Sequence, residues 1–265
     1  MKTLRQTLLT VLLTAIAVAT FSTTTLADTT PSVVNNDNAT VTVNYSYSYA
    51  NRVKVLVTKD STYQYELTTG NNSVELPLTE GNGTYTIKVC KNVEGTKYSV
   101  ISKFEVTVNE TDANEVFTVS NQIVNFDEND EAVKLAAELT KDLTDTTAKI
   151  DAIRDYVVEN YSYDYNKINT IAANTTYVPS IEETYTSKTG ICYDLSSLVA
   201  AMLRSVDVPC KVVKGYTPKA STYHAWNQVF VNGKWETMDV TYDVQIANEE
   251  MFKNVTDYSD VRYQY

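Results

Sequence analysis

The feature that most constrains the fold is a change in hydrophobic periodicity near residue 111. Before it, apolar and polar residues alternate with a period of two, which predicts half-buried β-strands. Four clear runs of this kind occupy residues 41–45, 53–57, 85–89 and 104–108. Turn-forming Gly and Asn clusters lie between them. Six or seven short strands with such turns predict an antiparallel β-sandwich of immunoglobulin-like type over residues 39–110.

After residue 111 the spacing of apolar residues becomes helical. Helices are indicated at residues 132–139, 145–160 and 192–205, with a polar loop before the last of them. Three strand-like runs follow, at residues 211–216, 224–231 and 234–240, and Asn232-Gly233 predicts a two-residue hairpin turn between the last two. Helices followed by strands predict an α+β domain over residues 131–265. Residues 111–130 are assigned to a linker.

The N-terminal residues have the composition of an export signal. Lys2 and Arg5 precede an apolar stretch at residues 8–21, and Ala27 provides a small residue at the cleavage point. Threonines dilute the stretch, so an uncleaved membrane anchor is the weaker alternative. Residues 28–38 are polar and are expected to be disordered. We therefore expect the signal peptide to be cleaved after residue 27 and the mature protein to be secreted or displayed at the cell surface.

Charge and rare residues exclude several classes of function. The formal net charge is −11, from 33 acidic and 22 basic residues. Such a chain lacks the basic face that nucleic acids or anionic membranes require. One His excludes a His-rich metal site, and three Cys exclude a disulfide-dense scaffold. Cys90 and Cys210 either form a disulfide that joins the two domains or remain buried thiols.

Three residues of the second half form a candidate reactive set. Cys192 is expected at the start of a helix, where free backbone N–H groups and the helix dipole favour a thiolate. His224 is the only imidazole in the chain and opens a predicted strand. Asp239 lies on the strand paired with it, and Asp243 is the rival carboxylate. Taken singly, each has a purely structural alternative: an inert buried thiol, a satisfied His, a surface charge.

Together these residues have the chemistry of acyl transfer. Cys192 is the nucleophile, His224 the general base and acid, and Asp239 the group that orients the imidazole. Backbone N–H groups at the helix start would stabilise an oxyanion. A metal site made by the same three residues is a poor second choice, because no short chelating pair is present. No cofactor or metal is required by this chemistry.

Three motifs resemble the transglutaminase-like superfamily. They are residues 189–198 (TGICYDLSSL), 223–227 (YHAWN) and 239–243 (DVTYD), within a resemblance that covers about residues 130–250. The resemblance implies a papain-like α+β fold with a Cys–His–Asp triad, which falls on Cys192, His224 and Asp239. Exported bacterial members often carry this domain behind a β-rich module.

The resemblance also implies roles for neighbouring aromatic residues. In the superfamily an aromatic or amide side chain upstream of the Cys assists the oxyanion, and Tyr163 and Tyr165 are the positional candidates. Tyr193 and Trp226, which follow the Cys and the His, are candidates for lining the substrate groove. The chain departs from the family pattern at Tyr193-Asp194, where Gly often occurs second, and at Cys210, where Ala is common.

Three functional hypotheses follow. The first is an exported thiol enzyme that acts on amide bonds of protein or peptide substrates through a thioester, with an amine (transamidation) or water (hydrolysis) resolving it. The second is a non-catalytic binding protein of the cell surface or cell wall that retains the fold. The third is an adhesive surface module centred on residues 28–120, which would bind cell-wall or surface components.

Overall fold

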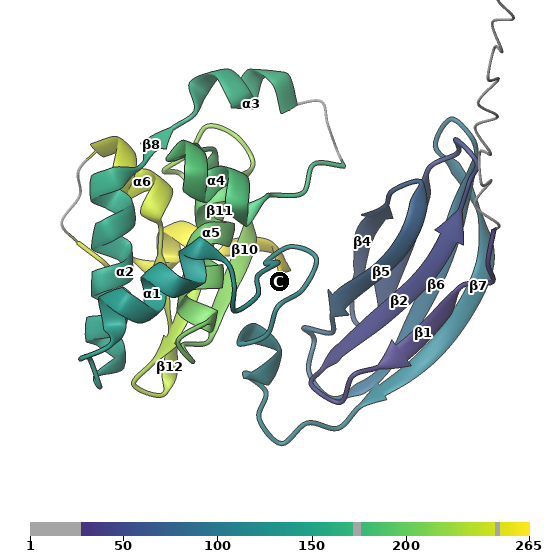
Figure 1. The fold of residues 1–265 in the computed structure, drawn as a ribbon, viewed down its shortest axis with the longest axis horizontal. Coiled ribbons are helices and arrows are strands. Elements are labelled where there is room, and N and C mark those ends of the chain that lie inside the picture. The colour runs from purple at the N-terminus through teal and green to yellow at the C-terminus, as the bar shows by residue number, and fades with distance from the viewer. Residues whose placement is uncertain (1–27, 172–175, 247–249) are drawn as a thin grey trace, which may run out of the picture.

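The structure is a computed structural model that describes residues 28–171, 176–246 and 250–265. The expected signal peptide, residues 1–27, lies outside the described residues. The chain folds into an N-terminal part made of strands and a C-terminal part made of helices around a sheet (Figure 1). No helix in the described part of the chain is long and apolar enough to cross a bilayer.

The N-terminal part, called here the β module, consists of two antiparallel sheets with strand orders β1-β2-β5 and β4-β3-β6-β7. Apolar side chains alternate inward, as in β3, and those of both sheets belong to one hydrophobic cluster. The four runs of alternation therefore locate β2, β3, β6 and β7 correctly, whereas Gly70-Asn71-Asn72, expected as a turn, begins β5. The strands are β1 (Ser32–Asn35), β2 (Thr40–Tyr47), β3 (Val53–Thr58), β4 (Thr62–Leu67), β5 (Gly70–Pro77), β6 (Gly83–Glu94) and β7 (Lys97–Val108).

Strand β1 corrects the expectation that residues 28–38 are disordered. It pairs antiparallel with β2, Val33 lying opposite Val43. The strand is at the edge of its sheet, and only Val33 among its four residues is even partly buried. Backbone hydrogen bonds stabilise such an edge strand, so its sequence carries little of the alternation by which buried strands are recognised.

The C-terminal part confirms the prediction of a mixed helix-and-sheet domain. Its main sheet has the antiparallel order β12-β11-β10-β13, and a short parallel pair joins β8 to β9. Two short helices, α3 and α4, lie where a polar loop was expected. The elements are α1 (Glu131–Thr140), α2 (Thr146–Asn160), β8 (Ser162–Tyr163), α3 (Tyr165–Ile171), α4 (Ile181–Ser187), β9 (Thr189–Gly190), α5 (Cys192–Arg204), β10 (Cys210–Tyr216), β11 (His224–Val231), β12 (Lys234–Met238), α6 (Val240–Ile246) and β13 (Asp260–Gln264).

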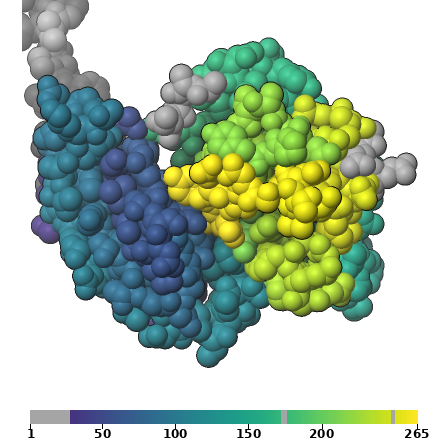
Figure 2. Space-filling model, turned by 180° about the vertical axis from the view of Figure 1, so that it is seen from behind, coloured from purple at the N-terminus to yellow at the C-terminus, as the bar shows by residue number. Residues whose placement is uncertain are grey.

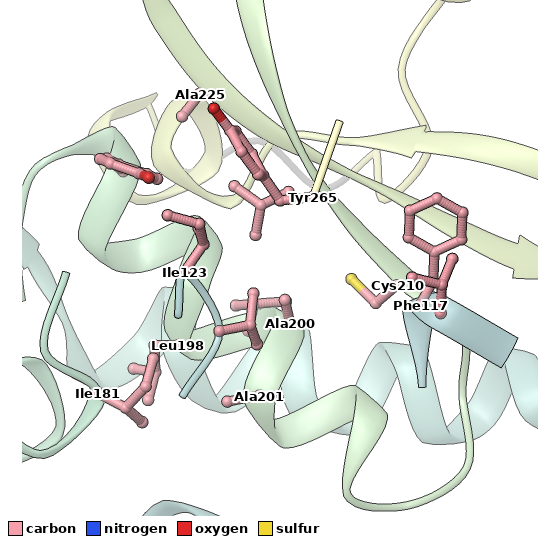
Figure 3. Close-up of a cluster of buried hydrophobic side chains, with 14 of the residues drawn as sticks. Phe117, Ile123, Ile181, Leu198, Ala200, Ala201, Cys210, Ala225 and Tyr265 are labelled. Carbon is pink, nitrogen blue, oxygen red and sulfur yellow. The ribbon is translucent and has the colours of Figure 1, made fainter. Parts of the chain in front are cut away.

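Helix α5 is the centre of this domain. All of its residues are buried, and Leu195, Leu198 and Met202 have no exposed surface. A helix buried on every side is surrounded by other elements, and α5 contacts α1, α2, α4, β10 and β11. Figure 3 shows Leu198, Ala200 and Ala201 of α5 within the core, with Tyr265 nearby. The first residue of α5 therefore has a fixed position.

The predicted linker, residues 111–130, is instead part of the core. It contains a short 3-10 helix, Glu115–Phe117, in which Phe117 is only 4% exposed. Buried Arg204 donates hydrogen bonds to the carbonyl oxygens of Val119 (2.8 Å), Cys210 (2.9 Å) and Tyr265 (2.8 Å). One guanidinium thus joins this segment, β10 and the C-terminus, a contact that local periodicity does not reveal.

Tyrosine rings connect the two parts. Tyr63 of the β module lies 5.4 Å from Tyr263 and 5.6 Å from Tyr265, both edge-on, and Tyr65 lies 6.0 Å from Tyr265. Edge-to-face aromatic pairs at these distances are favourable. Figure 2 shows the yellow C-terminal residues lying between the blue β module and the green part of the second domain.

The cysteines are all free, so the disulfide alternative is wrong. Cys90 is buried in β6 of the β module, and Cys210 is buried at the start of β10. Cys210 lies instead beside Asn227, whose amide is 3.5 Å from its sulfur. The two domains are therefore held by packing and hydrogen bonds.

Candidate active site

Cys192 is the first residue of α5, as the sequence predicted. The preceding turn is closed by Asp194, whose carboxylate accepts the backbone N–H of Ile191 at 3.0 Å. A Cβ at Gly190 would lie 2.8 Å from the Cβ of Asp194, closer than side-chain carbons approach. Gly190 is therefore required by this close contact, which seats the thiol at the positive end of the helix dipole.

The carboxylate of Asp194 has its own partners. Lys167 of α3 lies 3.1 Å from it, and the hydroxyl of Tyr177 donates a hydrogen bond to it. Asp194 is fully buried, so its charge needs such partners. These contacts fasten α3 and the residues before α4 to the helix start. The departure from the family pattern at Asp194 thus has a structural role beside the thiol.

His224 begins β11 and lies against Cys192. Its Nε2 is 2.8 Å from Oδ2 of Asp239, which leaves Nδ1 as the ring nitrogen available to Cys192. Burial lowers the pKa of His224, but the hydrogen bonds to Asp239 and Cys192 outweigh it and raise the pKa from 6.5 to about 10. The imidazole is thus held in its protonated form through the neutral pH range.

Asp239 is fully buried and lies one residue beyond the end of β12. The sequence placed it on the strand, but β12 ends at Met238 and α6 begins at Val240. Its Oδ1 accepts the N–H of Tyr242 at 3.0 Å, so it also caps the first turn of α6. The predicted proximity to His224 is present, through a turn between strand and helix.

Tyr258 is a residue of the candidate site that sequence reasoning missed. Its hydroxyl donates a hydrogen bond of 2.8 Å to Oδ2 of Asp239, the oxygen that also contacts His224. Tyr258 ends a short 3-10 helix, Val255–Tyr258, and is buried. Nothing in the local sequence distinguishes it among 20 tyrosines, because the contact depends on how the C-terminal segment returns to the sheet.

Asp243, the rival carboxylate, has a different environment. Arg154 lies 3.0 Å from one of its oxygens and Lys253 lies 2.6 Å from the other. Asp243 is fully buried, and the side chains of both cations are at most 6% exposed. This cluster joins α2, α6 and the segment after α6. Asp243 is therefore a structural ion-pair residue and does not orient His224.

The two oxyanion candidates are placed differently. Tyr163 of β8 pairs with Gly190 of β9, which brings it beside Cys192. Burial, and next the electrostatic influence of Cys192, raise the pKa of Tyr163 to about 12, so its hydroxyl keeps a proton to donate. Within the described residues that hydroxyl has no hydrogen-bond partner. Tyr165 is 64% exposed and donates to Gln245 at 3.1 Å.

The two groove candidates also differ. Trp226 has no exposed surface, and its ring lies 6.3 Å from that of His224 and 5.3 Å from that of Tyr258. The prediction that Trp226 lines the groove is wrong, because the β11 face that it shares with His224 is covered there by the C-terminal segment. Trp226 supports the imidazole from within the core. Tyr193 is 9% exposed and does line a cavity beside the thiol.

Two cavities meet at the thiol. One of about 440 Å³ extends past Tyr163, Asp239 and Gln245, and the other, of about 500 Å³, extends past Tyr177, Tyr193 and Lys214. Both are lined by the residues that surround the reactive atoms, Ile168, Cys192, Thr222, Tyr223 and His224. Two chemical groups can thus approach Cys192 from different directions. In the part of the chain that the structure describes, no cluster of three His, Cys, Asp or Glu is arranged to hold a metal ion.

Comparison with known proteins agrees with this arrangement. Residues 133–240, which contain Cys192, His224 and Asp239, match the family model of the transglutaminase-like superfamily. The chain therefore contains a transglutaminase-like domain, as its motifs indicated.

Curated relatives match in this region. The uncharacterized protein YebA of Bacillus subtilis (strain 168) is 29% identical over 125 residues, 40% of this chain and 17% of YebA. The uncharacterized protein ML0607 of Mycobacterium leprae (strain TN) is 35% identical over 83 residues, 27% of this chain and 29% of ML0607. The chain spans less than a third of the length of either relative.

Solved structures resemble the chain more distantly. A candidate cysteine protease from Cytophaga hutchinsonii has a TM-score of 0.43 at 15% identity, covering 82% of this chain and 76% of that one. Red sea bream transglutaminase has a TM-score of 0.35 at 10% identity, covering 81% of this chain and 49% of that one.

Proposed function

We propose that this protein is an exported thiol enzyme that cleaves or exchanges amide bonds of protein or peptide substrates through a thioester on Cys192. One observation carries the proposal: a Cys at a helix start lies where two cavities meet, beside a His whose Nε2 is 2.8 Å from a buried Asp. Nucleophile, base and orienting group are the parts that covalent acyl transfer requires.

The first half of the reaction forms the thioester. The sulfur of Cys192 attacks the amide carbon, and the carbonyl oxygen becomes an oxyanion. The backbone N–H at the start of α5 and the hydroxyl of Tyr163 are the donors available to stabilise it. The C–N bond then breaks, and the leaving amine takes the proton of the His224 imidazolium. Asp239 keeps the ring oriented while its charge changes.

The second half releases the product. Water or an amine attacks the thioester carbon and gives a proton to His224, and the C–S bond breaks to regenerate the thiolate. Water yields a carboxylic acid, and an amine yields a new amide. Two cavities at one thiol allow the acyl group to occupy one of them while the attacking molecule enters from the other.

The place of action belongs to the same proposal. The export signal expected at residues 1–27 supports substrates outside the cytoplasm, and the β module is a further surface for cell-wall or other surface components. The net charge of −11 favours partners other than nucleic acids.

The test uses the chain without its first 27 residues. It is incubated with a Gln-containing peptide and a labelled amine, and in parallel with peptide libraries, and products are identified by mass spectrometry. Product should form with the wild type and with Cys90→Ala, which removes a thiol of the β module, but not with Cys192→Ala. Failure of the folded wild type to yield product in either assay would overturn the proposal in favour of a binding protein.

A further inference from the structure

Lys214 is a partly buried lysine beside the thiol of Cys192. It lies on β10, opposite Ala225 of β11 and Tyr263 of β13, and it lines the cavity that contains Cys192 and Tyr193. It also lines a second cavity, of about 830 Å³, between the β module and the catalytic domain. Lys214 therefore marks the place where the active-site cavity meets the space between the domains.

The surroundings of Lys214 are aromatic. Its Nζ lies 4.2 Å from the ring centroid of Tyr193 and 5.8 Å from those of Tyr223 and Tyr265. Among the described residues, no carboxylate forms an ion pair with it. Burial lowers the pKa of Lys214, which means that the site disfavours the charge, while the nearby Cys192 opposes this effect.

A second lysine at the active site shows the contrast. Lys219 lines the cavity on the other side of the thiol and is paired with Asp257 at 3.2 Å. In a chain with 33 acidic and 22 basic residues, a half-buried lysine with no acidic partner leaves its charge free for another molecule. Aromatic rings around an ammonium group hold it in place without neutralising it.

We propose that Lys214 is a specificity residue that binds a carboxylate of the substrate, so that the preferred acyl donor is an acidic peptide. The acidic group would lie near the reacting amide, because Lys214 and Cys192 line one cavity. The identification of the peptide as an acyl donor rests on the proposed function. The anion site itself does not depend on turnover.

The second cavity indicates where the rest of such a substrate would lie. From Lys214 and Tyr223 it extends to Tyr216 and Arg262, and its far wall is formed by Ser61 and Thr62 of the β module. Arg262 is already paired with Asp260 at 2.7 Å, so Lys214 is the principal cation. A peptide that places its carboxylate at Lys214 would run between the domains along tyrosine rings.

The test measures Cys192 alkylation in the whole mature chain, without a substrate. Iodoacetate carries a carboxylate, and iodoacetamide is its neutral isostere. Peptide mapping follows Cys192 separately from buried Cys90 and Cys210. We expect Lys214→Gln to lower the rate with iodoacetate about 5-fold relative to the rate with iodoacetamide, as loss of a nearby charge requires. The matched control is Lys234→Gln, which removes a charge from the exposed first residue of β12 and should leave the ratio of rates unchanged.

Two outcomes would overturn the inference. If both rates fall equally in Lys214→Gln, the lysine assists the thiol and does not recognise anions; if neither changes, its charge does not reach the site. If Lys214→Gln fails to fold, Lys214→Arg is measured instead, and it must keep the wild-type ratio of the iodoacetate rate to the iodoacetamide rate. In the wild type, the ratio of the iodoacetate rate to the iodoacetamide rate must also fall as the salt concentration rises from about 20 mM to about 500 mM. Because alkylation needs no amide cleavage, a preserved preference in a protein without turnover would separate this inference from the proposed function.

Discussion

Two buried carboxylate clusters at the ends of the first turn of α6 show how partners decide the role of an acid. Asp239, just before the helix, contacts a neutral hydroxyl and the imidazole beside Cys192, whereas Asp243, one turn later, contacts Arg154 and Lys253. Both are fully buried. The first cluster orients the imidazole that exchanges a proton in the proposed reaction, and the second is closed by permanent charges. Burial alone therefore does not identify the carboxylate that orients the imidazole.

The largest effect is expected from Asp239→Asn. The amide keeps the shape but removes the charge that orients and stabilises the imidazolium, so the rate of acyl transfer should fall by about 10³- to 10⁴-fold. The measurement is kcat/KM on the substrate found in the peptide assay, together with thermal unfolding of the variant. A fall of less than 10-fold with the fold intact would mean that Asp239 has no role in catalysis.

Asp243→Ala should act on stability. Removing this carboxylate leaves Lys253 buried without its partner and takes one acceptor from Arg154, which typically costs about 3–5 kcal/mol of unfolding free energy. Urea unfolding measures the loss, and iodoacetamide alkylation of Cys192 in the folded fraction should stay within about 2-fold of wild type. A loss of Cys192 alkylation without a loss of stability would mean that Asp243 acts on the thiol, and the contrast with Asp239 would then be wrong.

The sole His makes the comparison visible by NMR, because all imidazole signals belong to His224. The midpoint of its titration should lie near pH 10 in the wild type and at a lower pH in Asp239→Asn. The folded pKa exceeds the unfolded value of 6.5, so this contribution to stability is complete below 6.5 and is lost as the pH rises through about 10. A midpoint near 6.5 in the wild type would contradict the hydrogen bonds described for the ring.

The smallest effect is expected from Tyr258→Phe. It removes one hydrogen bond to Asp239 and keeps the ring that contacts Trp226. Loss of a bond to a charged group typically costs about 1.5–3 kcal/mol, so kcat/KM should fall by about 10- to 100-fold, with the larger values if the carboxylate reorients. Tyr98→Phe, which changes a tyrosine of β7 in the β module, is the control. Equal rates for both variants would show that the hydroxyl does not position Asp239.

Much of the fold and of the reactive set was predictable from local sequence. Periodicity located α1, α2, α5 and most strands, and the Asn232-Gly233 turn set the pairing of β11 with β12. That pairing, with Cys192 at a helix start, was enough to bring three reactive residues together. The chemistry was visible because it depends on short-range rules applied to adjacent elements.

What was not predictable depends on long-range packing. β1 and β13 are edge strands with weak patterns, Tyr258 reaches Asp239 across 19 residues, and Trp226 is covered by a segment that ends the chain. Residues 111–130 looked like a linker because their buried contacts are made to Arg204 and to the β module. In each case the partner lies far away in the sequence, and no local sequence pattern identifies it.

The position of β13 has a consequence for the order of assembly. Synthesis proceeds from the N-terminus, so the nucleophile, the imidazole and Asp239 all leave the ribosome before Tyr258 and the strand that borders β10. The segment from Tyr258 to β13 both braces the orienting acid and pairs with β10 at the edge of the sheet. A nascent chain that has emerged only as far as Asp239 consequently carries Cys192, His224 and Asp239 in an unfinished frame, which Tyr258 and β13 complete.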